Sequence, residues 1–251
     1  DANAEDMPLW IAPDKKLDVA MMEACMRDHY EGTPLSLDHD IAQGNWDCPY
    51  RPTPLQYEVD GKKYFNERPT STQQTGFSYV AQLRSWLPRE LGGILWFGND
   101  DGNMIAYVPI YCSNTERAEC FNTPGADAVT FSDKNAFWVC NWVSNMVYPR
   151  YSQLFPSLKA VRDSLENAYF AAQPEVEAKA LSLYKTDKSA AVKYLNDYSI
   201  QKSNEMLARW KQLAIYLIVK YNDMAVKPEK DGKFERTATG WGARPSRPGM
   251  S

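Results

Sequence analysis

The sequence has few of the residues that build most recognisable active sites. It has only two histidines, His29 and His39, and its five cysteines form no CxxC pair and no cysteine–histidine cluster. A zinc site is therefore not expected, and we predict no metal and no cofactor. No GxSxG, HExxH, P-loop or GxGxxG motif is present, which removes the commoner hydrolase and nucleotide-binding classes.

The sequence also lacks a basic excess and a long apolar run. Its 251 residues carry 28 basic and 32 acidic side chains, a net charge of −4. This balance gives no electrostatic reason to expect nucleic acid or an anionic membrane as a partner. The apolar run 213–219 is too short to span a bilayer. The first residues lack the apolar region of a signal peptide, as a mature secreted chain would. We expect a secreted or periplasmic protein, with a cytoplasmic one as the alternative.

Residues 70–112 carry the clearest strand pattern. From 75 to 86 the chain alternates, which is typical of half-buried strands. One face carries Phe77, Tyr79, Ala81 and Leu83, and the other carries Ser78, Val80, Gln82 and Arg84. We expect an antiparallel meander with strands at about 75–87, 93–98 and 103–111. Asp101-Gly102 predicts a tight hairpin turn before the third strand, because Asp-Gly readily adopts the positive φ angles of such turns.

The flanking segments predict one hairpin and three helical regions. A hairpin is expected over 55–65, with Asp60-Gly61 at its turn. Apolar spacing predicts helices over 17–30, from a cap at Ser132 or Asp133 to Pro149, and through most of 158–222. Breaks in the last region are expected at Pro174, Asp187 and 197–198.

The expected fold class is therefore α+β: an antiparallel sheet meander flanked by helices, with a mostly helical C-terminal third. Three parts are expected, the α+β part at 1–156, a helical extension of the same domain at 157–226 and an irregular tail at 227–251. The tail is predicted because those residues have several prolines and glycines and no apolar period.

The cysteines and His29 allow more than one reading. Cys112 and Cys120 flank a polar loop, and either a disulfide between them in an oxidising compartment or two free thiols is consistent with that spacing. Cys25 and Cys140 fall on apolar helix faces, where a small hydrophobic residue is expected. His29, near the end of a predicted helix, is expected to interact with the helix dipole rather than to act in catalysis.

The polar run 66–75 directly precedes the first strand of the meander and is the candidate binding segment. Sites are often built from loops held by a rigid scaffold. Arg68 could bind a carboxylate bidentately, and an amide such as Gln73 could hydrogen-bond a peptide group. The predicted substrate-binding residues are Arg68, Ser71, Gln73, Gln74, Asn99 and Asp100, the last two as acceptors for an amino group. A solvated connector is the alternative for 66–75, and Asp101 is expected to be a turn former.

Three blocks carry a resemblance to a known family. They are LWIAPDKKL with MRDHYEGT (9–33), STQQTGFSYVAQLRSWLP with GGILWFG and YVPIYC (71–112), and DKNAFWVCNWVSNMVYPRYS (133–152). In this order they resemble the C-terminal half of the cysteine-type dipeptidases of the N-terminal-nucleophile hydrolase superfamily, relatives of penicillin V acylase and bile-salt hydrolase. The resemblance covers roughly residues 8–226.

The resemblance implies a four-layer αββα sandwich and cleavage of dipeptides by an N-terminal cysteine thiolate, with its own α-amino group as base. Residue 1 here is Asp, so we expect no catalytic residue in this chain and a nucleophile on the N-terminal half of the same enzyme. The expected partners are that half and a dipeptide substrate, and a second copy could contact the helical region. The alternative function is a non-catalytic secreted α+β binding module whose surface is the aromatic-rich meander.

Overall fold

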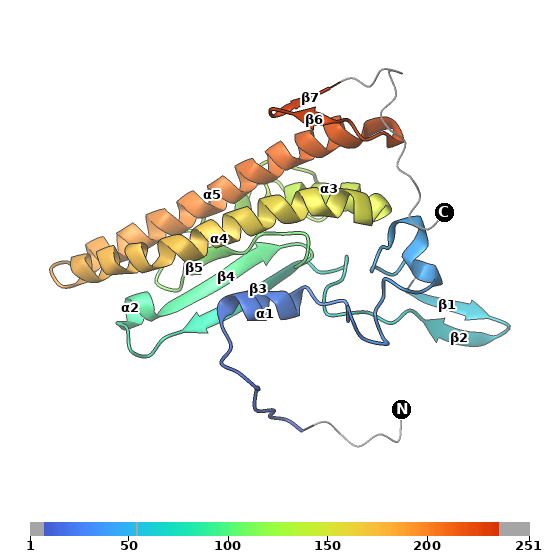
Figure 1. Ribbon diagram of the computed structural model, residues 1–251. Helices are drawn as coiled ribbons and strands as arrows, with labels where there is room; N and C mark the ends of the chain where they lie inside the picture. Colours follow the sequence, from blue (N-terminus) through green and yellow to red (C-terminus); the bar gives the residue numbers. More distant parts are fainter. Residues whose placement is uncertain (1–7, 54, 236–251) are drawn as a thin grey trace.

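A three-stranded antiparallel sheet with long helices over one face forms the centre of the fold (Figure 1). The computed structural model describes residues 8–53 and 55–235. The sheet has the order β3-β4-β5, with strands Phe77–Leu83, Gly93–Asn99 and Val108–Tyr111. Two small hairpins and a helical C-terminal region complete the chain. The predicted α+β class and the antiparallel order of the meander are confirmed.

The two faces of the sheet have different environments. On one face Trp96 packs against Phe170, with 4.7 Å between ring centroids, and Tyr111 lies 6.5 Å from Tyr198. Helices α4 and α5 therefore cover this face. The opposite face stays open: Tyr79 is 51% and Leu83 77% exposed. The alternation of β3 was correctly predicted, but it does not say that the face with the aromatic residues is the uncovered one.

The predicted hairpin turn at Asp101-Gly102 is wrong: the N–H of Met104 closes a turn on the carbonyl of Asp101 at 2.8 Å, but this turn does not lead directly into the third strand. Strand β5 begins only at Val108, and residues 100–107, here called the buried loop, are all buried. The left-handed conformation occurs at Asp100, with φ 83°, rather than at Gly102. A buried loop needs partners for its polar backbone groups. Side chains of α1 and α4 supply them, as described below, so the chain does not need to pair as a strand here.

Helices α3 (Ala136–Val147), α4 (Tyr151–Tyr184) and α5 (Lys188–Tyr221) form the helical layer. The predicted break at Asp187 is confirmed, because its side chain caps α5 by accepting from the N–H of Ala190 at 3.1 Å. The predicted breaks at Pro174 and 197–198 are wrong, since α4 and α5 run through them. Pro174 is exposed, so water can bond the carbonyl that its missing N–H leaves free. Helix α3 is capped by Asn135, not by Ser132 or Asp133.

The N-terminal part is partly as predicted. Helix α1 (Val19–Met26) ends before the expected Tyr30, which adopts a left-handed φ of 66°. The hairpin of β1 (Gln56–Val59) and β2 (Lys62–Phe65) is confirmed, with positive φ at Asp60 and Gly61. The remaining short helices are η1 (Ile41–Trp46), α2 (Arg89–Gly92), η2 (Glu119–Phe121), η3 (Tyr148–Arg150) and η4 (Asn222–Met224).

Part of the predicted tail is ordered. Strands β6 (Glu229–Lys230) and β7 (Lys233–Phe234) form a small hairpin, and the ring of Phe234 packs 5.3 Å from that of Tyr216 on α5. The expectation of an irregular tail is thus wrong for this hairpin, while 236–251 lie outside the described residues. Among the residues described, no helix combines the length and apolar character needed to cross a membrane.

Candidate functional site

The Ser71–Gln74 segment is fixed to the body of the protein at the end of the sheet. The hydroxyl of Ser71, which is 1% exposed, donates to Oδ1 of Asp101 in the buried loop. The backbone N–H of Ser71 donates to the carbonyl of Asp28 at 3.2 Å. The side-chain amide of Gln73 donates to the carbonyl of Arg51. The segment is therefore held from three sides.

Gln73 lines a pocket of about 490 Å³ next to this anchor. Tyr148, at the end of α3, forms another part of the wall, and Cys48 and Tyr50 come from the loop after η1. The remaining lining residues are Ala42, Gln43, Gly44, Asn45, Trp46, Arg51, Pro52, Thr53 and Pro149. A cavity of this size lined by aromatic residues with a few polar groups has the ordinary character of a small-molecule pocket.

Asp101 lies directly behind the pocket and is fully buried. Its Oδ2 accepts from the hydroxyl of Tyr148 at 3.1 Å, and its Oδ1 accepts from the N–H of Asn103 at 3.1 Å as well as from Ser71. Burial raises the pKa of this carboxyl, against the lowering effect of the hydrogen bonds from Ser71 and Tyr50. The sequence indicated only a turn at Asp101. The one sequence feature that could have indicated a site here is the pair of adjacent carboxylates, Asp100 and Asp101, directly after a strand.

Asp100 and Asn99 lie apart from this arrangement. The carboxylate of Asp100 is buried against α3, where it accepts from Ser144 at 2.6 Å and from Asn141 at 3.1 Å. Burial raises its pKa to about 7 even though both hydrogen bonds lower it. Asn99 pairs across the sheet with Phe77. The structure thus assigns Asp100 a contact between sheet and helix.

Arg68 and Gln74 are exposed on the same segment. The carbonyl of Arg68 accepts from the hydroxyl of Tyr30 at 3.3 Å, which fixes its backbone. Within the described part of the chain its guanidinium makes no hydrogen bond or ion pair. Of the six predicted binding residues, the structure brings only Gln73 into the pocket lining. It buries Ser71 against Asp101, keeps Arg68 and Gln74 exposed on the same segment, and separates Asn99 and Asp100.

Comparison with known proteins identifies the family. The model of peptidase family C69 matches residues 1–164, the part that contains the pocket and the whole sheet. The chain belongs to peptidase family C69. This confirms the resemblance to cysteine-type dipeptidases. A relative named probable dipeptidase B, from Streptococcus pyogenes serotype M1, is 21% identical over 150 residues, which are 60% of this chain and 30% of that protein. The chain thus spans about 30% of the length of the curated relative it matches.

Three of the five thiols of this C69 chain, those of Cys48, Cys120 and Cys140, are poorly suited to nucleophilic attack. Burial raises the pKa of Cys48 in the pocket wall, and the negative charge of Asp101 adds to the effect. Burial also raises the pKa of Cys120 to about 11 and that of Cys140 further above its usual range. A protonated thiol is a weak nucleophile. Cys25 and Cys112 are exposed, and all five cysteines are free, so no disulfide joins Cys112 to Cys120 in this structure.

His29 is held by Glu31 rather than by a helix end. Because α1 ends at Met26, the predicted interaction with the helix dipole is wrong. The buried ring places Nδ1 3.0 Å from Oε1 of Glu31, and its edge lies against Tyr50. Burial would raise the pKa of Glu31, but the hydrogen bonds from His29 outweigh it and lower that pKa to about 2. In the described chain, no hydrogen bond joins a cysteine to a histidine, and no group of three His, Cys, Asp or Glu residues is placed to hold a metal.

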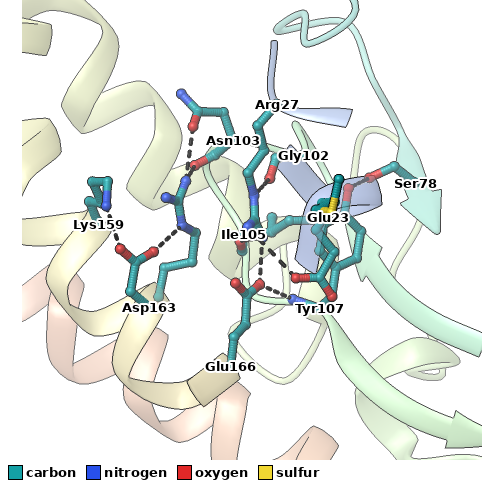
Figure 2. Close-up of polar contacts among 12 residues, drawn as sticks. Glu23, Arg27, Ser78, Gly102, Asn103, Ile105, Tyr107, Lys159, Asp163 and Glu166 are labelled. Atoms are coloured by element: carbon teal, nitrogen blue, oxygen red, sulfur yellow. Dashed lines mark hydrogen bonds and ion pairs between the residues drawn. The ribbon is translucent and has the colours of Figure 1, made fainter. Parts of the chain in front are cut away.

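Two arginines donate to the buried loop, and Figure 2 shows Arg27 beside Gly102 and Glu166. Arg27, the C-cap residue of α1, donates to the carbonyls of Gly102 at 3.0 Å and Ile105 at 3.5 Å, and it pairs with Glu166 of α4. Arg162 of α4 donates to the carbonyl of Asn103 at 2.8 Å and to its side-chain oxygen at 2.9 Å. These contacts fix the loop that carries Asp101, and through Asp101 they fix the pocket.

Proposed function

We propose that this chain is the substrate-positioning part of a cysteine-type dipeptidase whose nucleophile lies outside the 251 residues. The observation that carries the proposal is the anchored Ser71–Gln74 segment. It lies within the family match, places Gln73 in a pocket, and begins three residues after Arg68, whose cation is exposed. A dipeptide offers the groups this arrangement can bind, because it has a carboxylate, an amide and side chains within a few ångströms.

The environment of the pocket cysteine supports a nucleophile that comes from outside these 251 residues. The pocket cysteine, Cys48, has a raised pKa and no histidine partner, so it is a poor candidate for attack on a peptide carbonyl. In this proposal an N-terminal cysteine from the remainder of the enzyme supplies the thiolate, and its α-amino group takes the proton. The short coverage of the curated relative leaves room for such a remainder.

The open face of the sheet supports the αββα sandwich as the complete architecture. Phe77, Tyr79 and Leu83 of β3 are exposed, and Leu95 and Phe97 of β4 are partly exposed on the same face. Apolar side chains along a sheet face are typical of a surface that packs on a second sheet. We propose that a sheet from the remainder of the enzyme covers this face, with α4 and α5 forming the outer helical layer.

The sandwich is tested with a matched pair of leucines. Leu83 on the open face is 77% exposed and Leu35, after α1, is 71% exposed. In the full-length protein, Leu83→Arg should lower the melting temperature or the soluble yield, whereas Leu35→Arg should not, because only the former would bury a charge between sheets. Equal behaviour of the two variants would remove the sandwich proposal.

The dipeptidase function is tested with the full-length protein and dipeptide substrates. Arg68→Ala and Gln74→Ala should each lower kcat/KM by roughly tenfold, the value of one good hydrogen bond to a charged or polar substrate group. Both residues are exposed, so the melting temperature should hardly change. Arg89→Ala and Gln201→Ala, exposed residues of the same types elsewhere, are the controls. If Arg68→Ala and Gln74→Ala have the same kcat/KM as their control variants, residues 66–75 only connect two strands and do not bind substrate.

A protein that hydrolyses no dipeptide would favour the alternative function, a non-catalytic binding module. The open aromatic face would then be its binding surface. In that case Leu83→Arg should abolish binding of its partner without lowering the melting temperature.

A further inference from the structure

We propose that Asp101 is a positioning residue for substrate binding: its buried carboxylate joins the two walls of the pocket and keeps them at the spacing that admits an uncharged side chain of the substrate dipeptide. This inference rests on the proposed function and adds to it a residue and a class of side chain.

The two oxygens of Asp101 serve different walls. Oδ1 accepts from the hydroxyl of Ser71, two residues before the pocket residue Gln73. Oδ2 accepts from the hydroxyl of the pocket residue Tyr148 at 3.1 Å. Ser71 and Tyr148 belong to segments far apart in the sequence, and within the described chain no hydrogen bond joins them directly. The carboxylate is therefore one of the contacts between the walls. Others are the bond from Gln73 to the carbonyl of Arg51 and the packing of Tyr148 on Tyr50, with 4.7 Å between ring centroids.

The rest of the molecule keeps Asp101 itself in place. The N–H of Asn103 donates to Oδ1 at 3.1 Å, and the N–H of Met104 donates to the carbonyl of Asp101 at 2.8 Å. Arg27 and Arg162 hold the same loop at Gly102 and Asn103. Since interior side chains are closely packed, a rigid loop transmits its position to the groups bonded to it.

The charges of the pocket wall are neutralised within the protein, and this determines which kind of substrate side chain the pocket can accept. Arg51 is the one ionisable cation among the lining residues, and its guanidinium is bound to Asp40 at 2.6 Å and to Glu67 at 3.2 Å. The hydroxyl of Tyr148 is bound to Asp101, so its ring is what remains for a ligand. Trp46, Pro52 and Pro149 add apolar surface. A charged side chain would lose its hydration here without meeting an unpaired opposite charge. The buried amide oxygen of Gln43, which has no partner within the described chain, offers one neutral acceptor. The pocket therefore suits an uncharged side chain, aromatic or apolar.

Asp100 provides a matched control for the kinetic test. It is adjacent, equally buried and bonded to two side chains, but those belong to α3 and its contacts do not reach the pocket. In the full-length protein, Asp101→Asn should raise KM for alanyl-phenylalanine about tenfold with little change in kcat, as expected when binding is weakened equally in ground and transition states. KM for glycylglycine, which has no side chain to place, should stay within about twofold. Asp100→Asn should change neither KM, although it should lower the melting temperature.

Alkylation of Cys48 by iodoacetamide, followed by peptide mass mapping, gives a readout that needs no activity. Ser71→Ala and Tyr148→Phe each delete one hydroxyl bonded to Asp101 and leave the carboxyl group itself in place. Both should speed alkylation severalfold by loosening the walls. Ser203→Ala, which deletes a buried hydroxyl of α5 bonded to the carbonyl of Ser199, should leave the rate unchanged.

The outcomes separate this inference from the proposed function. Equal KM effects of the two aspartate variants, an equal rise of KM for both dipeptides, or equal alkylation rates in all three hydroxyl variants would overturn the role of Asp101. A full-length protein without dipeptidase activity would instead remove the proposed function, and the alkylation rates would still decide whether Asp101 holds the walls. Should Asp101→Asn fail to fold, Ser71→Ala and Tyr148→Phe carry the KM comparison against Ser203→Ala.

Discussion

Arg27 and Glu166 form a largely buried ion pair although 139 residues separate them in the sequence. The same guanidinium donates to carbonyls of the buried loop, and the same carboxylate oxygen accepts from the N–H of Tyr107 at 2.8 Å. The pair thus joins α1, α4 and the loop behind the pocket (Figure 2). Burial would lower the pKa of Arg27, but the neighbouring carboxylates of Glu166 and Glu23 raise it, so the charge is retained.

Replacing Arg27 should destabilise the protein strongly. Arg27→Met leaves the Glu166 carboxylate and two loop carbonyls buried without their donor, which should lower the free energy of unfolding by about 3–5 kcal/mol. Denaturant unfolding measures this. Arg209→Met, an exposed arginine on α5, should change it by less than about 0.5 kcal/mol. A small effect of Arg27→Met would mean that α1 is not held by this pair.

Glu23 should make the stability fall as the pH rises. Burial, together with the charge of Glu166, raises the pKa of Glu23 to about 9, against the lowering effect of Arg27 and Arg162. The folded state therefore holds this proton when the unfolded state has released it, and the stabilisation is lost between about pH 4.5 and pH 9. Glu23→Gln should flatten that part of the stability profile, whereas Glu175→Gln, on the exposed side of α4, should follow the wild type. Identical slopes for Glu23→Gln and the wild type would contradict the assignment.

Gly102 is required for close approach rather than for a turn. A Cβ at this position would lie 2.9 Å from the Tyr107 hydroxyl and 3.0 Å from the carbonyl oxygen of Met26. Gly102→Ala should therefore cost roughly 1–3 kcal/mol of stability by forcing α1 and the buried loop apart. Gly76→Ala, where a Cβ meets nothing within 4 Å, is the control and should be near neutral. Thermal unfolding of the two variants decides between close approach and a generic glycine effect.

The isolated 251-residue chain should show no dipeptidase activity. Loss of a catalytic nucleophile costs on the order of 10⁶ in turnover, which puts any residual rate below ordinary detection. Incubation of the purified chain with alanyl-phenylalanine, with product amines measured over hours, checks this. Steady hydrolysis that survives substitution of Cys25 and Cys112, the two exposed thiols, would show that another residue of this chain acts as the nucleophile.

Much of the local structure could be predicted because it depends on neighbouring residues. The alternation of 77–83 decided that β3 is a strand, and Asp60-Gly61 decided the turn of the β1–β2 hairpin, since both are short-range effects of side-chain direction and backbone sterics. The Asp187 cap of α5 belongs to the same class. The family could be recognised for a different reason. The three sequence blocks are long and occur in a fixed order, and such a combination rarely arises in unrelated proteins.

The candidate site was predictable only as a segment. The polar run before β3 indicated Ser71 and Gln73, but nothing local shows that Gln73 lines a pocket with Tyr148. The role of Asp101 could not be predicted, because Asp-Gly is a strong turn signal. In the structure, long-range contacts with Ser71 and Tyr148 determine the environment of Asp101 instead. Asp100 was hidden for the same reason: its partners Ser144 and Asn141 lie on a helix more than 40 residues away.

The sequence by itself determined the periodic elements, the family and the class of candidate groups. Only the tertiary structure decided which face of the sheet is covered, where the third strand begins and which polar groups are removed from water. The reason is physical: strand alternation and turn propensity act over a few residues, whereas burial depends on which distant elements pack together. At 100–107, Arg27 and Arg162 satisfy the loop's polar groups from two helices, and no pattern within the loop itself reports their presence.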